Sequence, residues 1–284
     1  MSANLTVLLL VAVVCAAVRA DAEKTPLQLF WKDGILTISG EKLPGKEMKV
    51  LYLEAYCRGD SHTTEWDTHT VIRHKTQLLS ENKDHTEIKL RDTLTDGVIV
   101  EHTIKAHSDE VDFRLTAHNP TDKASEAQWA QPCIRVGEFT GTRDPNKPES
   151  YDYLNKSFVF LDGKLSTMPT RNWATEARYT PGQVWAAPGV APSDVNPRPL
   201  NPNTPSCGLI GCFSADDSMI FATAWDPYQE LFQGVITCLH SDFRIGGLKP
   251  GETKHIHGKI YYMRNDVPAL LKRYSRDFPD QNRR

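Results

Sequence analysis

Apolar and polar side chains alternate through the middle of the chain. Within residues 85–119, Ile88 and Leu90, and later Phe113 and Leu115, are each separated by a charged side chain. A period of two predicts strands that bury one face and expose the other. This segment therefore indicates β-structure with a solvated outer surface.

Short turn sequences divide the same segment into three strands. Asp96-Gly97 and Ser108-Asp109 lie at the two boundaries, and Asp-Gly supplies the positive φ that a tight hairpin needs. An antiparallel meander is the expected arrangement. Apolar stretches of strand length also occur at residues 50–53, 70–72, 158–160, 219–221 and 259–262.

The predicted fold is all-β, an antiparallel β-sandwich in one domain over residues 21–284. Strands dominate and no βαβ alternation occurs, which argues against a doubly wound sheet. One short helix is expected near the C-terminus, where Asp266 can cap, Pro268 suits the first turn, and Leu270 and Tyr274 share a face. We expect this helix to pack on the sheet edge.

The strand pattern stops between residues 140 and 205. Seven prolines lie within residues 181–205, and tryptophan, tyrosine and arginine side chains are interspersed before and among them. Long loops of this kind are usually functional or disordered. The aromatic content favours a long Pro-rich loop that packs over the sheet as a lid.

Residues 1–20 have the features of a secretory signal. An apolar run from Leu5 to Val18 precedes Arg19 and Ala20, and small residues at the junction suit cleavage after Ala20. A membrane anchor is the alternative, but spanning a bilayer takes about 20 apolar residues. A lipoprotein attached at Cys15 is a second alternative. The expected location is secreted or periplasmic, without membrane attachment after cleavage.

The net charge and the cysteine content restrict the partners, disulfides and metal sites that are expected. With 33 basic and 36 acidic residues among 284, the net charge is −3, so nucleic acid is not an expected partner. Cleavage leaves five cysteines, which permits one disulfide or several buried thiols. The pair Cys207 and Cys212 lacks the spacing of a zinc finger. His255 and His257 share a strand face, but without a third ligand we predict no metal and no cofactor.

Two segments resemble the core of galactose-mutarotase-like β-supersandwich proteins. They are HTIKAHSDEVDFRLTAHNPTDKASEAQWAQPCIRV at residues 102–136 and GLKPGETKHIHGKIYYM at residues 247–263. The resemblance implies a carbohydrate ligand, because this family contains sugar epimerases and domains of polysaccharide lyases and glycoside hydrolases. After the turn at Asn119, epimerases usually place a catalytic histidine, whereas this chain has Gln128 to Cys133. Aldose epimerisation is therefore not expected.

Ionisable groups concentrate late in the chain. Glu230, His240 and Asp242 are candidate proton-transfer residues, and nearby Asp226 is a candidate ligand-binding residue. Turn-capping aspartates and a core histidine would give the same pattern.

A second candidate group follows the turn at Asn119. If residues 127–136 form a strand, Trp129, Gln131, Cys133 and Arg135 share one face. Trp129, Gln131 and Arg135 are therefore candidate ligand-binding residues, although a tryptophan buried in the core fits equally well.

The predicted lid supplies the remaining candidates. Arg171, Trp173, Arg178 and Trp185 could give cationic and stacking contacts to an acidic sugar. The alternative is that the same residues hold the loop against the sheet and contact no ligand.

Two functional hypotheses follow. The first is an exported carbohydrate-active enzyme, a polysaccharide lyase or hydrolase, that binds an oligosaccharide or polysaccharide. The second is a non-catalytic sugar-binding or periplasmic interaction module. Ionisable groups that converge on one reacting bond would distinguish the enzyme from the module, and the sequence leaves this choice open.

Overall fold

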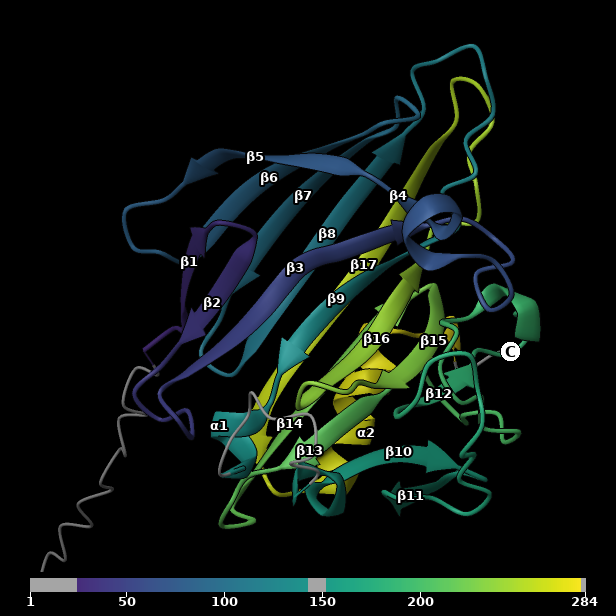
Figure 1. The fold of residues 1–284 in the computed structure, drawn as a ribbon. Coiled ribbons are helices and arrows are strands. Elements are labelled where there is room, and N and C mark those ends of the chain that lie inside the picture. The colour runs from purple at the N-terminus through teal and green to yellow at the C-terminus, as the bar shows by residue number, and fades with distance from the viewer. Residues whose placement is uncertain (1–24, 143–151, 282–284) are drawn as a thin grey trace, which may run out of the picture.

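The computed structural model describes residues 25–142 and 152–281, which form two antiparallel sheets packed face to face (Figure 1). The predicted signal segment, residues 1–20, lies outside the described residues. Within them, sheet A has eight strands in the order β1-β2-β3-β9-β16-β15-β12, with β4 paired to β3. Its strands are β1 (Gln28–Lys32), β2 (Ile35–Ser39), β3 (Glu47–Cys57), β4 (Val71–Ile72), β9 (Trp129–Arg135), β12 (Gln183–Ala186), β15 (Tyr228–Gln233) and β16 (Cys238–Arg244).

Sheet B has nine strands within the same residues, in the order β11-β10-β13-β14-β17-β8-β7-β6-β5. Its strands are β5 (His74–Glu81), β6 (Glu87–Leu94), β7 (Ile99–Ala106), β8 (Glu110–His118), β10 (Ser157–Leu161), β11 (Lys164–Thr167), β13 (Ile210–Phe213), β14 (Met219–Asp226) and β17 (Thr253–Arg264). The predicted antiparallel β-sandwich is confirmed.

The main core lies between the sheets. Leu36 and Val50 from sheet A and Ile88, Ile104 and Phe113 from sheet B are all at most 1% exposed and belong to one cluster. Alternate residues on each strand face this cluster, as the period of two predicts. The opposite, outer face of sheet A does not contribute to this core.

The expected meander is β6, β7 and β8. Gly97 has a φ of 94° in the turn between β6 and β7, so the hairpin uses the conformation that glycine allows. The sequence did not indicate β5, whose side chains are mostly exposed. An edge strand with two solvated faces carries little hydrophobic alternation.

The C-terminal helix is α2 (Val267–Asp277), and the Asp266 side chain caps it by accepting a hydrogen bond from Ala269 N at 2.9 Å. Leu270 and Tyr274 are buried against the outer face of sheet B. The expectation of edge packing is corrected, because the apolar outer surface of β10, β14 and β17 gives the helix a larger area to cover.

Other helical segments are short. They are α1 (Gly137–Thr140), a π-helix over Trp66–Thr70, and 3₁₀ turns over Asp152–Lys156 and Pro192–Asp194. No helix among the described residues is long and apolar enough to cross a membrane.

The segment expected to form one long loop, residues 140–205, is partly regular. β10 and β11 join sheet B and β12 forms an edge of sheet A, while residues 143–151 lie outside the described part. The proline-rich stretches on either side of β12 remain irregular and run along one side of sheet A.

Candidate functional site

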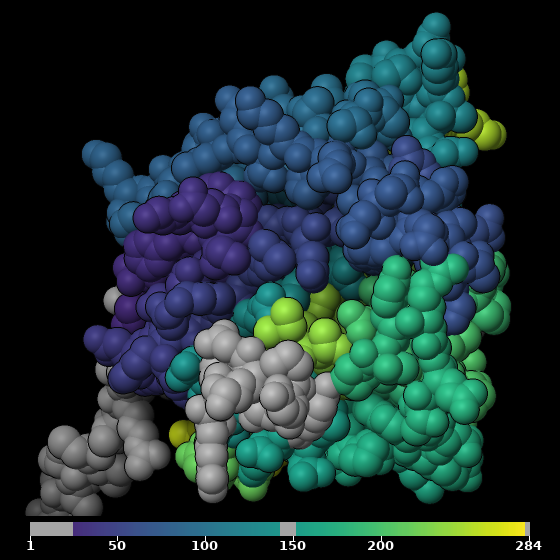
Figure 2. Space-filling model, viewed as in Figure 1, coloured from purple at the N-terminus to yellow at the C-terminus, as the bar shows by residue number. Residues whose placement is uncertain are grey.

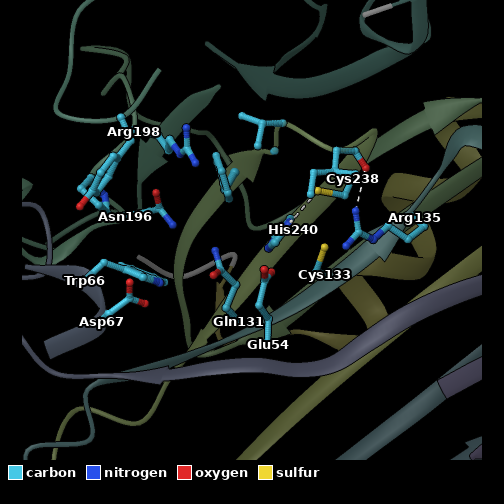
Figure 3. Close-up of a pocket in the computed structure, with 16 residues that line it drawn as sticks. Glu54, Trp66, Asp67, Gln131, Cys133, Arg135, Asn196, Arg198, Cys238 and His240 are labelled. Carbon is cyan, nitrogen blue, oxygen red and sulfur yellow. Dashed lines mark hydrogen bonds between the residues drawn. The ribbon is translucent and has the colours of Figure 1, made fainter. Parts of the chain in front are cut away.

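A cleft of about 260 Å³ opens on the outer face of sheet A. Figure 2 shows yellow-green atoms of the β15–β16 region between blue and green surfaces from earlier parts of the chain. Strands β3, β9, β15 and β16 form the floor, and irregular segments form the walls (Figure 3). The lining residues are Glu54, Trp66, Asp67, Gln131, Cys133, Arg135, Tyr179, Asn196, Pro197, Arg198, Phe232, Gly234, Val235, Ile236, Cys238 and His240.

Strand β9 lies between β3 and β16 in the floor and contributes side chains to the cleft through its alternation. Gln131, Cys133 and Arg135 line the cleft, while Ala130 and Ile134 face the core between the sheets. The face predicted from the sequence therefore forms. Arg135 is held by a hydrogen bond from its Nη1 to Ile236 O at 3.0 Å.

An irregularity in β3 brings a carboxylate to the cleft. The pairing of β3 with β9 shifts register between Leu51 and Ala55, and Glu54 lies within the irregular segment. A bulge of this kind redirects a side chain next to a site. Figure 3 shows Glu54 and Gln131 pointing into the same part of the cleft.

Trp66 forms part of one wall. Its ring centroid lies 6.1 Å from that of Trp129, with 52° between the ring planes. Trp129 is fully buried against Ala55 and Cys57, and Trp66 is half-buried. The aromatic ring that reaches the cleft is therefore that of Trp66, and Trp129 supports it from beneath.

The opposite wall comes from the proline-rich segment. Arg198 lies over the ring of Tyr179, with its guanidinium carbon 5.6 Å from the centroid. Arg178 joins the two walls, because its guanidinium donates to the backbone carbonyls of Thr64, at 2.7 Å, and of Thr63. These hydrogen bonds thus tie the segment that carries Trp66 to the segment that carries Tyr179.

His240 lies on the floor and is 1% exposed. Its Nε2 lies 3.3 Å from Cys238 Sγ, and its Nδ1 lies 3.5 Å from Asp242 Oδ1. Cys238, His240 and Asp242 are alternate residues of β16 and share one face. Burial alone would lower the pKa of His240, but the charges of Cys238 and Asp242 outweigh it and raise that pKa.

Two carboxyl groups lie behind His240. Glu230 on β15 pairs with Asp242 on β16, and both are 0% exposed. Glu230 Oε2 accepts a hydrogen bond from Asn196 N at 2.8 Å, and Asp242 Oδ2 accepts one from Gln131 Nε2 at 3.3 Å.

This burial changes the protonation of both carboxyls. Burial and the neighbouring Asp242 raise the pKa of Glu230, and burial raises the pKa of Asp242 to about 6. Two adjacent buried carboxyls cannot both ionise readily. Ionisation of either carboxyl therefore disfavours ionisation of the other.

Two thiols flank the histidine. One ligand-type atom from each of Cys133, Cys238 and His240 lies within 4.8 Å of the other two. All three residues are buried, at no more than 4% exposed. The hydrogen bond between the thiols lowers the pKa of Cys238 and raises that of Cys133. This cluster can supply one imidazole nitrogen and two sulfur ligands.

The structure brings together part of the predicted set. Gln131, Arg135 and His240 line the cleft. Glu230 and Asp242 lie directly beneath it, where they contact the backbone of one wall and His240.

Other predicted ligand-binding residues lie elsewhere. Trp185 is fully buried in the core between the sheets, and Trp173 packs on it with ring centroids 6.0 Å apart. Because β12 alternates, Val184 faces outward and Trp185 faces inward. Arg171 is exposed, and its carbonyl accepts a hydrogen bond from Asn203. Asp226 lines a separate small cavity at the end of β14.

His255 and His257 are partnered across β17 and β8. His257 Nε2 lies 2.8 Å from Asp112 Oδ2, and His255 Nδ1 lies 3.2 Å from the Thr116 hydroxyl. These side chains share a face, as the spacing predicted, and lie on sheet B, whereas the cleft opens on sheet A.

The sequence did not indicate several lining residues, including Glu54, Trp66, Asp67 and Arg198. The position of Glu54 depends on the irregular pairing of β3 with β9, which no local sequence pattern predicts. The segment Glu65-Trp66-Asp67, a tryptophan between two acidic residues, is the sequence signal that could have pointed to Trp66 and Asp67. Its position at the cleft follows from tertiary contacts, such as the hydrogen bond from Asp60 N to Asp194 Oδ1 at 2.8 Å.

No protein-family model matches the chain. No curated protein sequence matches it either. Among solved structures, a protein from Escherichia coli K12 proposed to be an aldose 1-epimerase is 10% identical, with a TM-score of 0.45, and the alignment covers 84% of this chain and 99% of that one.

Two further solved structures have comparable scores. The Slr1438 protein from Synechocystis sp. PCC 6803 is 9% identical, with a TM-score of 0.44 and coverage of 84% and 97%. A galactose mutarotase-like protein from Lactobacillus casei ATCC 334 is 8% identical, with a TM-score of 0.42 and coverage of 83% and 99%. The three alignments thus cover most of each chain at identities of 8–10% and TM-scores of 0.42–0.45.

Proposed function

We propose that this protein binds a carbohydrate in the cleft on sheet A. The observation that carries the proposal is the composition of one small cavity, in which aromatic, arginine, carboxylate and amide side chains converge. Ligand sites usually combine apolar surface with a few placed polar groups. Sugars present both surfaces, because their C–H faces are apolar and their hydroxyl groups donate and accept hydrogen bonds.

Each wall has a distinct role in this proposal. Trp66 offers a half-buried ring, held in place by Trp129, for a sugar C–H face. Arg135 and Arg198 donate to hydroxyl or carboxylate oxygens. Glu54 accepts hydrogen bonds from sugar hydroxyl groups. The two arginines line the same cavity as Glu54 and Asp67, so both neutral and acidic sugars are candidate ligands.

Export is part of the proposal. The apolar run in residues 1–20 and the small residues at Ala20 support it. A secreted or periplasmic protein would meet oligosaccharides and polysaccharides outside the cytoplasm. Mass spectrometry of the exported protein tests this part: a mature chain that begins at Asp21 supports it, and a retained N-terminal segment contradicts it.

Turnover of a polysaccharide, by a lyase or hydrolase reaction, is a second candidate function. The observation that favours it is that His240 and Glu54 line the same cleft, while Asp242 lies 3.5 Å behind the His240 ring. Such a set can transfer protons. Glu230 and Asp242 are fully buried, so they would act by positioning His240 rather than by touching the sugar.

Isothermal titration against a panel of neutral and acidic oligosaccharides tests binding. The wild-type protein should bind at least one class, and Trp66→Ala should weaken that binding by on the order of 1 kcal/mol or more. Phe30→Ala is the matched control, because Phe30 is 39% exposed on β1 and lies outside the cleft. Absence of binding to every panel member, or equal losses in the two variants, contradicts the proposal.

A turnover assay on the same panel separates the two candidate functions. Loss of turnover in Glu54→Gln with retained binding would support an enzyme. Binding without turnover in the wild-type protein would identify a binding module.

A further inference from the structure

We propose that Cys133, Cys238 and His240 bind one Zn²⁺ ion on the floor of the cleft, with a fourth coordination position open to the ligand. The three side chains come from the neighbouring strands β9 and β16 and are brought together by strand pairing. The register that pairs Leu239 with Ile134 places His240 opposite Cys133.

The ligand atoms are already close to zinc geometry. One ligand atom from each residue lies within 4.8 Å of the others, and His240 Nε2 lies 3.3 Å from Cys238 Sγ. Tetrahedral Zn²⁺ with ordinary Zn–S and Zn–N distances separates such atoms by about 3.6 Å. Small side-chain rotations would therefore complete the site, and two sulfur ligands with one imidazole favour a thiophilic ion.

The surroundings of His240 match those of a metal-bound histidine. Nε2 faces Cys238 Sγ at 3.3 Å, while Nδ1 faces Asp242 Oδ1 at 3.5 Å. Asp242 is itself fixed by Gln131 Nε2 at 3.3 Å. Histidine ligands commonly point their second ring nitrogen at a carboxylate, which sets the tautomer and the ring orientation.

Gly234 leaves the space that the cluster uses. A Cβ atom at this position would lie 2.3 Å from Cys238 Sγ and 3.4 Å from His240 Nε2. Any larger residue would thus displace the thiol. The glycine backbone forms one side of the cluster without filling it.

Three protein ligands and an open position are typical of catalytic zinc, whereas structural zinc usually has four protein ligands. Cys133, Cys238 and His240 all line the cleft, and Glu54 points toward the same region (Figure 3). The open position would hold water or a ligand oxygen beside Glu54. This inference goes beyond carbohydrate binding, which the cleft walls can provide without a metal. With Zn²⁺ bound, His240 Nε2 would be a ligand, and the proton-transfer role would fall to Glu54.

Zinc titration of the fully reduced, metal-free full-length protein tests the site. We expect one Zn²⁺ per chain by calorimetry, and Co²⁺ should give tetrahedral d–d bands with sulfur-to-cobalt charge-transfer absorption. Cys133→Ser, Cys238→Ser and His240→Ala should each weaken Zn²⁺ binding on the order of 100-fold or more. Cys207→Ser is the matched control, because Cys207 lies in a different cavity.

Two further variants keep all three ligands. Gly234→Ala should weaken Zn²⁺ binding by displacing the Cys238 sulfur, and Asp242→Asn should weaken it about ten-fold by removing the carboxylate behind His240. Circular dichroism of each variant verifies folding. Unchanged affinity in both variants would contradict the proposed geometry.

Three other outcomes would overturn the proposal. They are no Zn²⁺ uptake with all thiols reduced, a Cys133–Cys238 disulfide in the exported protein, and selective alkylation of Cys238 as a lone nucleophile without metal uptake. None of these outcomes bears on carbohydrate binding, which is measured separately with Trp66→Ala. Failure of the zinc site is thus distinguishable from failure of the proposed function.

Discussion

The indole ring of Trp66 packs against that of Trp129, with centroids 6.1 Å apart and ring planes inclined by 52°. One ring belongs to the π-helix that follows β3 and the other to β9 in the middle of sheet A. Trp129 is fully buried and Trp66 is half-buried, so the two rings have different roles. The inner ring supports the sheet surface, and the outer ring faces the cleft.

Substitution of the two tryptophans should therefore have different effects. Trp129→Ala should lower the free energy of unfolding by about 3–5 kcal/mol, because it leaves a large cavity. Trp66→Ala should lower it by about 1 kcal/mol and act mainly on ligand affinity. Urea denaturation followed by circular dichroism measures both. Equal destabilisation by the two variants would contradict this division.

Arg178 is expected to act on affinity through the walls of the cleft. Its two hydrogen bonds hold the carbonyls of Thr63 and Thr64, so Arg178→Ala should loosen both segments and weaken carbohydrate binding about five-fold, on the order of 1 kcal/mol. Hydrogen exchange should become faster around residues 60–65. Arg178→Lys keeps the charge but lacks the planar fork, so its effect should be intermediate. Exchange as slow as in the wild type would argue against this role.

Glu230 is expected to anchor the opposite wall. Its Oε2 accepts the hydrogen bond from Asn196 N at 2.8 Å, so Glu230→Ala would leave a buried donor unsatisfied and cost about 1–3 kcal/mol. Glu230→Gln retains an acceptor oxygen and should be milder. Thermal unfolding of the two variants, compared with their carbohydrate affinities, checks this expectation. A glutamine variant as unstable as the alanine variant would show that the anchor is not the hydrogen bond.

Acid stability should depend on Asp112. Burial alone would raise the pKa of Asp112, but hydrogen bonds from His257 and Arg114 outweigh it and lower the pKa from 3.8 to about 2. Lys259 lies 3.9 Å from the same carboxylate. Because the folded-state pKa is depressed, the stabilisation is present above the unfolded-state pKa and is lost as pH falls from about 4 to about 2.

Asp112→Asn removes this titration. The wild-type protein should lose about 1–2 kcal/mol from this group over that pH range, less than a fully buried pair would lose because solvent screens it. The asparagine variant should be less stable than the wild type at pH 6 and approach it near pH 2. Urea denaturation at several pH values measures the difference. A stability gap that stays constant across the range would contradict the assignment.

Much of the fold could be predicted from the sequence because burial is periodic. Ile88, Leu90, Phe113 and Leu115 alternate along strands that each bury one face, so a short window of sequence records which face is covered. The edge strand β5 (His74–Glu81) escaped prediction because most of its side chains are solvated. The position of α2 on the outer face of sheet B also depends on an apolar surface assembled from separate strands.

The cleft was less predictable because it depends on strand register. Periodicity placed Gln131, Cys133 and Arg135 on one face of β9, but only the pairing with β16 brings Cys133 beside His240. Trp185 shows the converse. Its place in a proline-rich segment suggested a contact from a lid to the ligand. The segment instead forms β12, and the Trp185 side chain points into the core between the sheets.

A structure of the complex with the tightest-binding saccharide of the panel tests the central claim most directly. The account predicts that the sugar lies in the cleft on sheet A, with a C–H face against the ring of Trp66 and oxygen atoms within hydrogen-bond distance of Arg198 or Glu54 (Figure 3). A saccharide bound at any other surface, with this cleft unchanged, would contradict it.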